Sequence, residues 1–165
     1  MKKIVIYSHK SDKPFKLKNG DVYDSYLEVY DDNKLLKKFY NVNVDSSLKY
    51  NQGKTEIENG VYAGIVGLHR NSYKAILLFD YNALNLVDNW KQFFTNWEKY
   101  GNYRVLKTIY PNPANGNRKI AIGINIHKGG DDWDYSAGCI TLHKSVYDDF
   151  INIFVMNEKV IIEKI

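Results

Sequence analysis

The chain contains one cysteine, Cys139, and a histidine, His127, stands upstream of it at the end of an apolar run. Glycine and aspartate are frequent between the two, so the backbone there can fold back and bring the side chains together. A cysteine attacks a carbonyl as the thiolate, which forms at neutral pH when a base or a positive charge lies nearby. The pair therefore predicts a cysteine-dependent acyl-transfer enzyme, with Cys139 as nucleophile and His127 as base.

Residues beside the pair supply the other parts of such a site. Gly138 lets the backbone turn tightly before Cys139, so that the N–H groups of both residues can point at a developing oxyanion. The carbonyl group of Lys128 is a candidate to orient the imidazole of His127, as the third member of a catalytic triad does. We predict that Cys139, His127, Gly138 and Ser136 form the catalytic set.

Aromatic and basic residues of the same segment are candidates for contacts with a substrate. Trp133 and Tyr135 are predicted to line a peptide groove, although packing into the core explains such residues equally well. Lys128 is also predicted to bind the substrate. All three belong to the segment that leads from the histidine to the cysteine, so they are expected near the reacting thiol.

The acidic residues of this segment, Asp131, Asp132 and Asp134, are expected to form a solvated turn. Close to the site, their negative charges would raise the pKa of Cys139 and favour the protonated form of His127. An imidazolium–thiolate pair is the resting state that this arrangement predicts.

The same residues allow other interpretations. A lone cysteine is most often a buried, unreactive small side chain, and a histidine that ends an apolar run is often a hydrogen-bonded core residue. Cys139, His143, His127 and Asp131 also offer a set of zinc ligands, although their spacing is not that of a common zinc site. We predict no metal and no cofactor.

The candidate site depends on strands that end or begin beside it, and the pattern of apolar residues predicts both strands and helices. Strands are expected over residues 4–7, 22–30, 35–44, 61–68, 73–79, 103–110, 118–126 and 159–165. Helices are expected over residues 82–100 and 144–155. The predicted fold class is α+β, a mainly antiparallel β-sheet domain, sandwich-like or barrel-like, with two α-helices. We predict one domain over residues 1–165.

Charge and composition restrict the partners. The formal net charge of +4 in 165 residues suits an anionic polymer such as cell-wall material, and no signature of nucleic-acid binding is present. No apolar run is long enough for membrane insertion. Residues 1–8 resemble a strand more than a signal peptide. We therefore expect a cytoplasmic, phage-encoded or non-classically secreted protein, with action in the periplasm as one option. The sequence predicts no particular oligomeric state.

The segment around Cys139 resembles the catalytic signature of L,D-transpeptidases of the YkuD type. The resemblance is carried by Ile126-His127-Lys128-Gly129 and by Ser136-Ala137-Gly138-Cys139-Ile140-Thr141-Leu142. Weaker similarity to other segments of the family lies in residues 26–35, 56–62 and 160–162. The chain departs from the family at Ala137, where a second histidine is usual, and at Thr141, where arginine or asparagine is common.

The resemblance implies a function for this divergent member. It implies action on peptidoglycan stem peptides, as an L,D-transpeptidase or L,D-carboxypeptidase, through a thioacyl intermediate on Cys139 with His127 as base. The residues do not predict whether an amine or water accepts the acyl group. The alternative is a non-catalytic cell-wall-binding module, or a phage- or effector-associated module, on the same fold. The departures at Ala137 and Thr141 favour that alternative.

Overall fold

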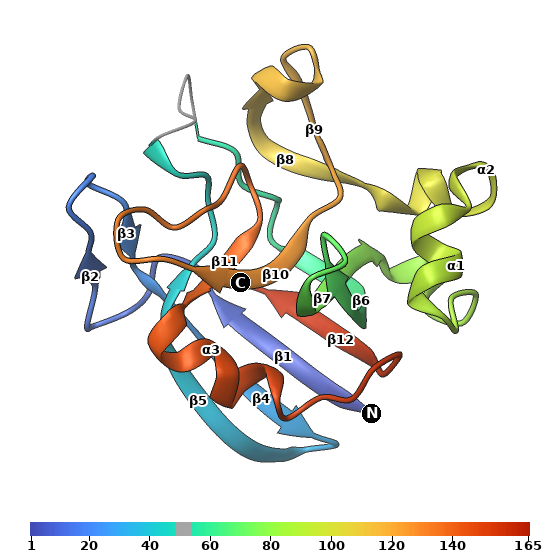
Figure 1. Ribbon diagram of the computed structural model, residues 1–165, viewed down its shortest axis with the longest axis horizontal. Helices are drawn as coiled ribbons and strands as arrows, with labels where there is room; N and C mark the ends of the chain where they lie inside the picture. Colours follow the sequence, from blue (N-terminus) through green and yellow to red (C-terminus); the bar gives the residue numbers. More distant parts are fainter. Residues whose placement is uncertain (49–53) are drawn as a thin grey trace.

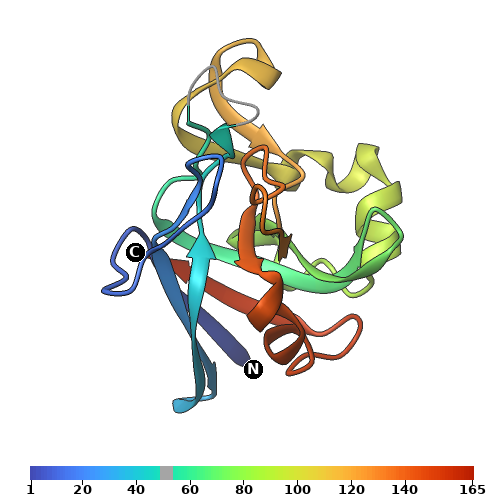
Figure 2. The same ribbon diagram turned by 60° about the vertical axis from the view of Figure 1, so that its left-hand side comes forward.

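The computed structural model describes residues 1–48 and 54–165, and eight strands of these residues close into a barrel (Figures 1 and 2). In order around the barrel they are β1 (Lys2–Tyr7), β12 (Lys159–Lys164), β6 (Gly60–His69), β7 (Tyr73–Asp80), β10 (Asn125–Gly129), β11 (Ile140–His143), β5 (Lys34–Asn43) and β4 (Ser25–Asp31). Neighbouring strands pair antiparallel except for two parallel pairs, β1 with β12 and β10 with β11. The second parallel pair carries the candidate site.

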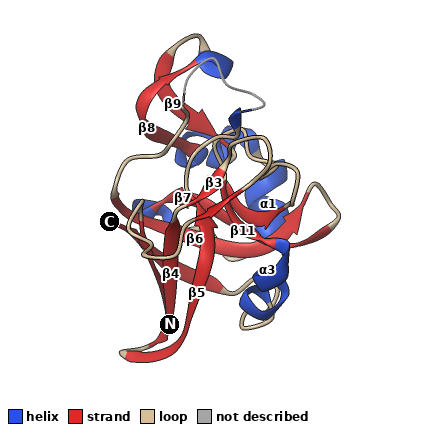
Figure 3. Cartoon of the chain, turned by 90° about the vertical axis from the view of Figure 1, so that its left-hand side faces the viewer, coloured by secondary structure: helices blue, strands red, loops and turns tan. Residues whose placement is uncertain are grey.

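Two small sheets and the helices lie outside the barrel. The hairpin of β8 (Val105–Asn112) and β9 (Arg118–Ile122) extends away from it, and β2 (Phe15–Lys16) pairs with β3 (Val22–Tyr23) (Figure 1). The α-helices of the described residues are α1 (Trp90–Thr95), α2 (Trp97–Tyr100) and α3 (Lys144–Ile151), and short 3-10 helices form at Tyr81–Ala83, Gly101–Arg104 and Pro113–Asn115. Figure 3 shows how far the strands outweigh the helices. None of these helices is long and apolar enough to cross a membrane.

Side-chain alternation along the strands divides the apolar residues into two clusters. The larger cluster fills the barrel and includes Ile126 of β10, Ile140 of β11 and Phe150 of α3. The smaller cluster covers the outer face of β6 and β7, where Phe79 packs with Trp90 and other residues of the segment around α1. β6 and β7 are therefore buried on both faces, which makes them a rigid support for the turn that joins them.

The strand predicted over residues 118–126 is divided in two. β9 pairs with β8, whereas β10 pairs with β7 and β11 in the barrel. Gly123 lies between them with φ +75°, in the left-handed region that glycine enters at little cost. This bend redirects the chain from the outer hairpin into the barrel and so places His127.

The predicted α+β class with a mainly antiparallel sheet is confirmed, and the sheet closes as a barrel. The described residues form three short α-helices where two were predicted. The helix predicted over residues 82–100 is wrong in its length. Asn89 caps α1, and Asn96 ends α1 while its side chain accepts a hydrogen bond from the backbone N–H of Lys99 in α2. Asparagine side chains compete for backbone hydrogen bonds in this way. The helix therefore breaks at Asn96, although the apolar periodicity continues across that residue. The second predicted helix ends earlier than expected, at Ile151.

Candidate functional site

Pairing of β10 with β11 brings Cys139 and His127 to the same face of the sheet. In this parallel pair Ile126 lies opposite Ile140, and His127 lies opposite Thr141. Ile126 and Ile140 point into the barrel core, so the alternating residues His127 and Cys139 point outward. The two predicted catalytic side chains thus lie side by side on the outer face of the barrel, His127 on β10 and Cys139 immediately before β11.

Backbone groups hold the sulfur of Cys139. The backbone N–H of Asn125 donates to Sγ at 3.4 Å, and the thiol donates to the carbonyl of Gly123 at 3.8 Å. The side chain is partly exposed, yet the protein packed around the sulfur desolvates the thiolate and raises the pKa of Cys139 to about 11. At neutral pH the resting side chain is therefore the neutral thiol.

The imidazole of His127 is almost fully buried and is held in one orientation. Nδ1 donates to the carbonyl of Lys128 at 3.0 Å, which is the contact expected from the sequence. The ring stacks on His69 with 4.3 Å between centroids. Burial, followed by the charge of His69, lowers the pKa of His127 to about 4. With Nδ1 protonated, Nε2 is left to accept a proton.

These pKa shifts contradict the predicted imidazolium–thiolate pair. The resting pair is a thiol and a neutral imidazole, and within the described part of the chain no hydrogen bond joins His127 to Cys139. The physical reason is that burial disfavours the charged form of both groups. Asp131, which was expected to favour imidazolium on His127, instead pairs with His143 and Lys144.

A cleft of about 430 Å³ opens over the pair. Its floor contains His127, Lys128 and Cys139, and its walls come from the turn between β6 and β7 and from the loop before Cys139. The wall residues are His69, Arg70, Ser72, Tyr73, Trp133, Tyr135 and Ala137. The volume lies within the range of small-ligand sites, and the mix of aromatic and polar side chains is typical of them.

The three predicted substrate-binding residues, Trp133, Tyr135 and Lys128, all line this cleft. The rings of Trp133 and Tyr135 meet edge to face with 4.7 Å between centroids, and Tyr135 is about half exposed. The ammonium of Lys128 lies 5.2 Å from the ring centroid of Tyr73 and 3.8 Å from Asp148. The two aromatic rings thus form an open wall, whereas the lysine ammonium is partly occupied by groups of the protein.

Ser136 and Gly138 shape the loop instead of facing the cleft. Ser136 is fully buried, and its Oγ accepts from the backbone N–H of Gly138 at 3.0 Å and donates to the carbonyl of Cys139 at 2.6 Å. The N–H of Gly138 is therefore already engaged, which contradicts the predicted oxyanion donor. Gly138 has φ +132°, and a Cβ there would lie 2.7 Å from Thr55, so glycine is required.

Replacing Ser136 with alanine is expected to lower the free energy of unfolding by about 1–3 kcal/mol, because two buried backbone groups lose their partner. Denaturant unfolding measures the change. Ser11→Ala is the control, since Ser11 Oγ accepts a hydrogen bond from the backbone N–H of Lys13 in an exposed turn, and it should change stability by less than about 0.5 kcal/mol. Equal effects of the two substitutions would contradict a structural role for Ser136.

A buried carboxylate anchors the loop that carries these residues. Asp21 accepts from the backbone N–H of Asp134 at 3.1 Å, from Ser47 Oγ at 2.5 Å and from the backbone N–H of Leu48 at 2.7 Å. Burial raises the pKa of Asp21, but these hydrogen bonds outweigh burial and leave the pKa lowered. Asp134 is fully buried, and burial raises its pKa to about 8. The predicted solvated turn is therefore wrong for Asp134.

Asp134→Asn is expected to stabilise the protein increasingly as pH rises. The wild-type carboxyl has a pKa of about 8 when folded and 3.8 in its ordinary state, so wild-type stability falls as pH rises between these values. Asparagine removes that dependence while its side-chain oxygen can still accept from Ser136 N–H. Unfolding at several pH values should show a stability gain that grows by at most about 1.4 kcal/mol per pH unit. A gain that is independent of pH would contradict the buried neutral carboxyl.

The four candidate zinc ligands do not converge among the described residues. His143 Nε2 lies 2.5 Å from Asp131 Oδ1, and its Nδ1 lies 2.7 Å from Ser145 Oγ. His127 stacks on His69 instead, and the sulfur of Cys139 is hydrogen-bonded to backbone groups of Asn125 and Gly123. Zinc coordination by this particular set is therefore not supported by the geometry.

Sequence reasoning missed the residues that the β6–β7 turn contributes. His69 stacks on the predicted base and binds the side chain of Asn125 at 3.1 Å through Nδ1, and Tyr73 accepts from Lys128 N–H at 3.3 Å. No local pattern marks them, because their role arises from pairing between β7 and β10. Comparison of the chain with protein-family models, curated proteins and solved structures finds no match.

Proposed function

We propose that the cleft catalyses acyl transfer through Cys139, with His127 as general base. The observation that carries this proposal is that His127 of β10 and Cys139, the residue before β11, line one cleft, with His127 Nδ1 hydrogen-bonded to the Lys128 carbonyl. The Lys128 carbonyl thus orients the imidazole through Nδ1, as the third member of a catalytic triad does, and leaves Nε2 available for proton transfer. Catalytic hydrogen bonds are often long without substrate and tighten when it binds.

The reaction then has two balanced stages. The Cys139 thiol transfers its proton to His127 Nε2 as sulfur bonds to the amide carbonyl carbon, and the C–N bond breaks as the amine leaves with that proton. An acceptor amine or water next gives a proton to His127 and bonds to the carbonyl carbon, and the C–S bond breaks to regenerate the thiol. Because both groups rest neutral, proton transfer accompanies attack instead of preceding it.

The proposed substrates are peptidoglycan stem peptides, cut after an L-centre and before a D-amino acid. The support is the resemblance of the segment around Cys139 to L,D-transpeptidases, together with the cleft. Arg70 and Lys128 supply positive charge at the cleft, which suits the carboxylates of such peptides, and Trp133 and Tyr135 supply flat apolar surface. The proposed reaction is transpeptidation or carboxypeptidation, and we propose that the protein meets its substrate in the cell wall.

Incubation with purified muropeptides tests this proposal. The expected result is loss of the terminal D-residue, or its exchange for an added D-amino acid, detected by mass spectrometry. Hydrolysis without exchange would identify a carboxypeptidase. An unchanged stem peptide under all conditions, including high acceptor concentration, would reject the proposed substrate.

Two observations favour a second candidate, a module that binds stem peptides without turnover. The pKa of Cys139 is raised to about 11, whereas most activated cysteines have a lowered pKa. Ala137 also lines the cleft where the resembled family has a histidine. Binding of an intact muropeptide, measured by calorimetry and blocked by Trp133→Ala, with no covalent adduct on Cys139, is the result expected of a binding module.

A further inference from the structure

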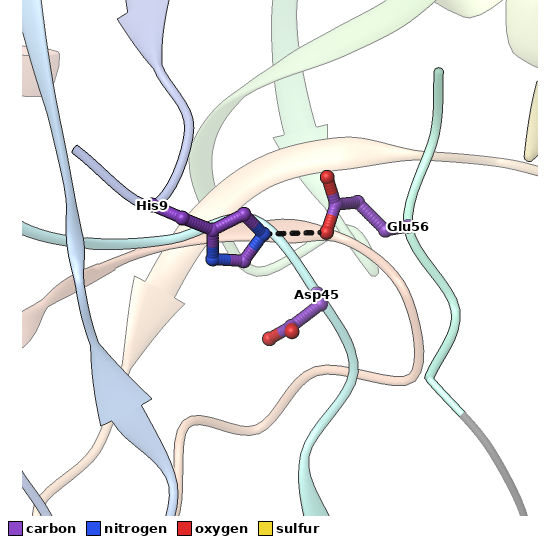
Figure 4. Close-up of side chains that lie close together, drawn as sticks. All are labelled: His9, Asp45 and Glu56. Carbon is purple, nitrogen blue, oxygen red and sulfur yellow. Dashed lines mark hydrogen bonds and ion pairs between the residues drawn. The ribbon is translucent and has the colours of Figure 1, made fainter. Parts of the chain in front are cut away.

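A second cluster of side chains lies outside the cleft, at one end of the barrel. His9 follows β1, Asp45 follows β5, and Glu56 precedes β6. Their potential ligand atoms all lie within 4.8 Å of one another, and Figure 4 shows the imidazole and the two carboxylates around a common space. None of the three residues lines the cleft that holds Cys139.

The imidazole of His9 is held by a carboxylate on each side. Nδ1 lies 2.8 Å from Asp24 Oδ2, and Nε2 lies 2.7 Å from Glu56 Oε1. In metal sites a histidine ligand commonly donates one ring N–H to an outer carboxylate, which fixes the ring and directs the other nitrogen to the metal. Asp24 holds His9 in that way and leaves Nε2 facing the cluster.

Glu56 is fixed by a buried lysine. The ammonium of Lys164 is almost fully buried and donates to Glu56 Oε2 at 2.8 Å and to Asn59 Oδ1 at 3.0 Å. A buried ammonium requires a permanent counter-charge, so this oxygen of Glu56 stays bound to Lys164. The other oxygen, Oε1, is the one directed at His9 and the space between the ligands.

The surroundings of the Asp45 carboxylate point to a cation. Its side chain is almost buried, and in the described ranges its carboxylate meets only the ammonium of Lys54, at 3.7 Å and from an exposed side chain. Burying a carboxylate with so little compensation is costly. The carboxylates of Asp24 and Glu56 flank the imidazole of His9, while Lys54 and Lys164 contact Asp45 and Glu56. With a neutral imidazole, three carboxylates and two ammonium groups leave one net negative charge, which a cation would offset.

We propose that His9, Asp45 and Glu56 bind a divalent transition-metal ion, with Asp24 and Lys164 as outer supports. One imidazole nitrogen and two carboxylate oxygens are the donor types that Zn²⁺ takes in sites with an open fourth position. Ligands about 2.0–2.2 Å from a tetrahedral ion lie about 3.3 Å apart, so His9 Nε2 and Glu56 Oε1 separate slightly. The ion replaces the proton shared between them, and that proton passes to solvent.

An adjoining cavity completes the site. Asp24, Asp45 and Lys54 are among the residues that line a cavity of about 130 Å³. This volume admits a few water molecules, so it provides an entry path and a place for a water ligand on the fourth position. The proposed ion is therefore exchangeable, and it can be removed by a chelator and restored.

Equilibrium dialysis of the full chain against Zn²⁺, after treatment with a chelator, tests the proposal. The expected result is one ion per chain. Asp24→Asn should weaken binding about 10- to 100-fold, as loss of an outer carboxylate does, and Asp45→Asn should weaken it at least as much. Circular dichroism checks that both variants fold. Glu56→Gln is a poorer choice, because it leaves the Lys164 ammonium buried without its counter-charge.

Asp131→Asn is the matched control. Asp131 also pairs with a histidine, His143, and with a lysine, Lys144, but no second carboxylate faces that histidine in the described residues. Its substitution should leave Zn²⁺ binding unchanged. No binding by the wild type would overturn the proposal and leave the cluster as an ion-pair network. Binding that Asp45→Asn and Asp131→Asn affect equally would place the ion elsewhere and overturn it as well.

Discussion

Replacement of Cys139 by alanine is expected to lower kcat for release of the terminal D-residue about 10⁶-fold, the loss seen when a triad nucleophile is removed. No other thiol exists in the chain to take over, since Cys139 is the single cysteine. The substitution is also expected to abolish a covalent adduct detected by intact-protein mass spectrometry. Steady-state kinetics on a muropeptide measures the first effect, and a slowly hydrolysed amide or thioester substrate traps the second.

The alanine variant should remain folded, because the hydrogen bonds of the sulfur to Asn125 and Gly123 are weak. Its free energy of unfolding is expected to change by about 1 kcal/mol or less. Cys139→Ser is the chemical control: the hydroxyl can keep both contacts but is a much weaker acid, so turnover should also be lost. Equal turnover by wild type and Cys139→Ala would remove Cys139 from the mechanism.

Replacement of His127 by glutamine is expected to lower kcat about 10²- to 10⁴-fold, the usual contribution of a general base. His69→Gln is the matched variant, because it removes the other imidazole of the same stack but not the proposed base. His69→Gln should lower kcat less. If the two variants lose activity equally, the base assignment fails. If His127→Gln does not fold while His69→Gln does, His127 is a core residue.

The pH dependence of wild-type activity also tests the assignment of His127 as the general base. A base must be deprotonated, and the pKa of His127 is about 4, so activity should be present at pH 6 and fall as pH drops through about 4. Loss of the neighbouring His69, whose charge helps to lower this pKa, should move the acid limb to higher pH. An acid limb near pH 6.5 in both proteins would contradict the buried, neutral base.

The free energy of unfolding should also depend on the protonation of His127. The pKa of His127 is lowered from 6.5 to about 4 by folding, so its contribution to stability is complete above pH 6.5 and is lost as pH falls to 4. The shift corresponds to about 3 kcal/mol. His127→Gln should therefore reduce the difference in unfolding free energy between pH 7 and pH 4 by about 3 kcal/mol. This readout is independent of turnover.

Much of the barrel was predictable because each strand has one face in the core. The alternation in residues 22–30 and 35–44 predicted the strands that pair as β4 and β5, and the runs at 61–68 and 73–79 predicted those that pair as β6 and β7. The division at Gly123 was missed, since an apolar run continues on both sides of it. Apolar periodicity also continues across Asn96, where a side-chain hydrogen bond separates α1 from α2.

The sequence predicted which residues line the candidate site but not what each of them does there. Trp133, Tyr135 and Lys128 line the cleft with Cys139 and His127, and all five were selected from one segment. The oxyanion role of Gly138 was contradicted because a hydroxyl two residues earlier takes its N–H. The residue types allow the Gly138 N–H either to face an oxyanion or to bind Ser136 Oγ. Only the folded loop determines which acceptor the N–H meets.

The sequence by itself determined which side chains can react, because residue type and spacing along the chain are local properties. The tertiary structure decided that Cys139 and His127 lie together, since this depends on the pairing of β10 with β11. The tertiary structure decided their protonation states, since burial raises the pKa of Cys139 and lowers that of His127. It also decided that His9, Asp45 and Glu56 meet. These residues come from separate segments of the chain, and closure of the barrel is what brings their ligand atoms together.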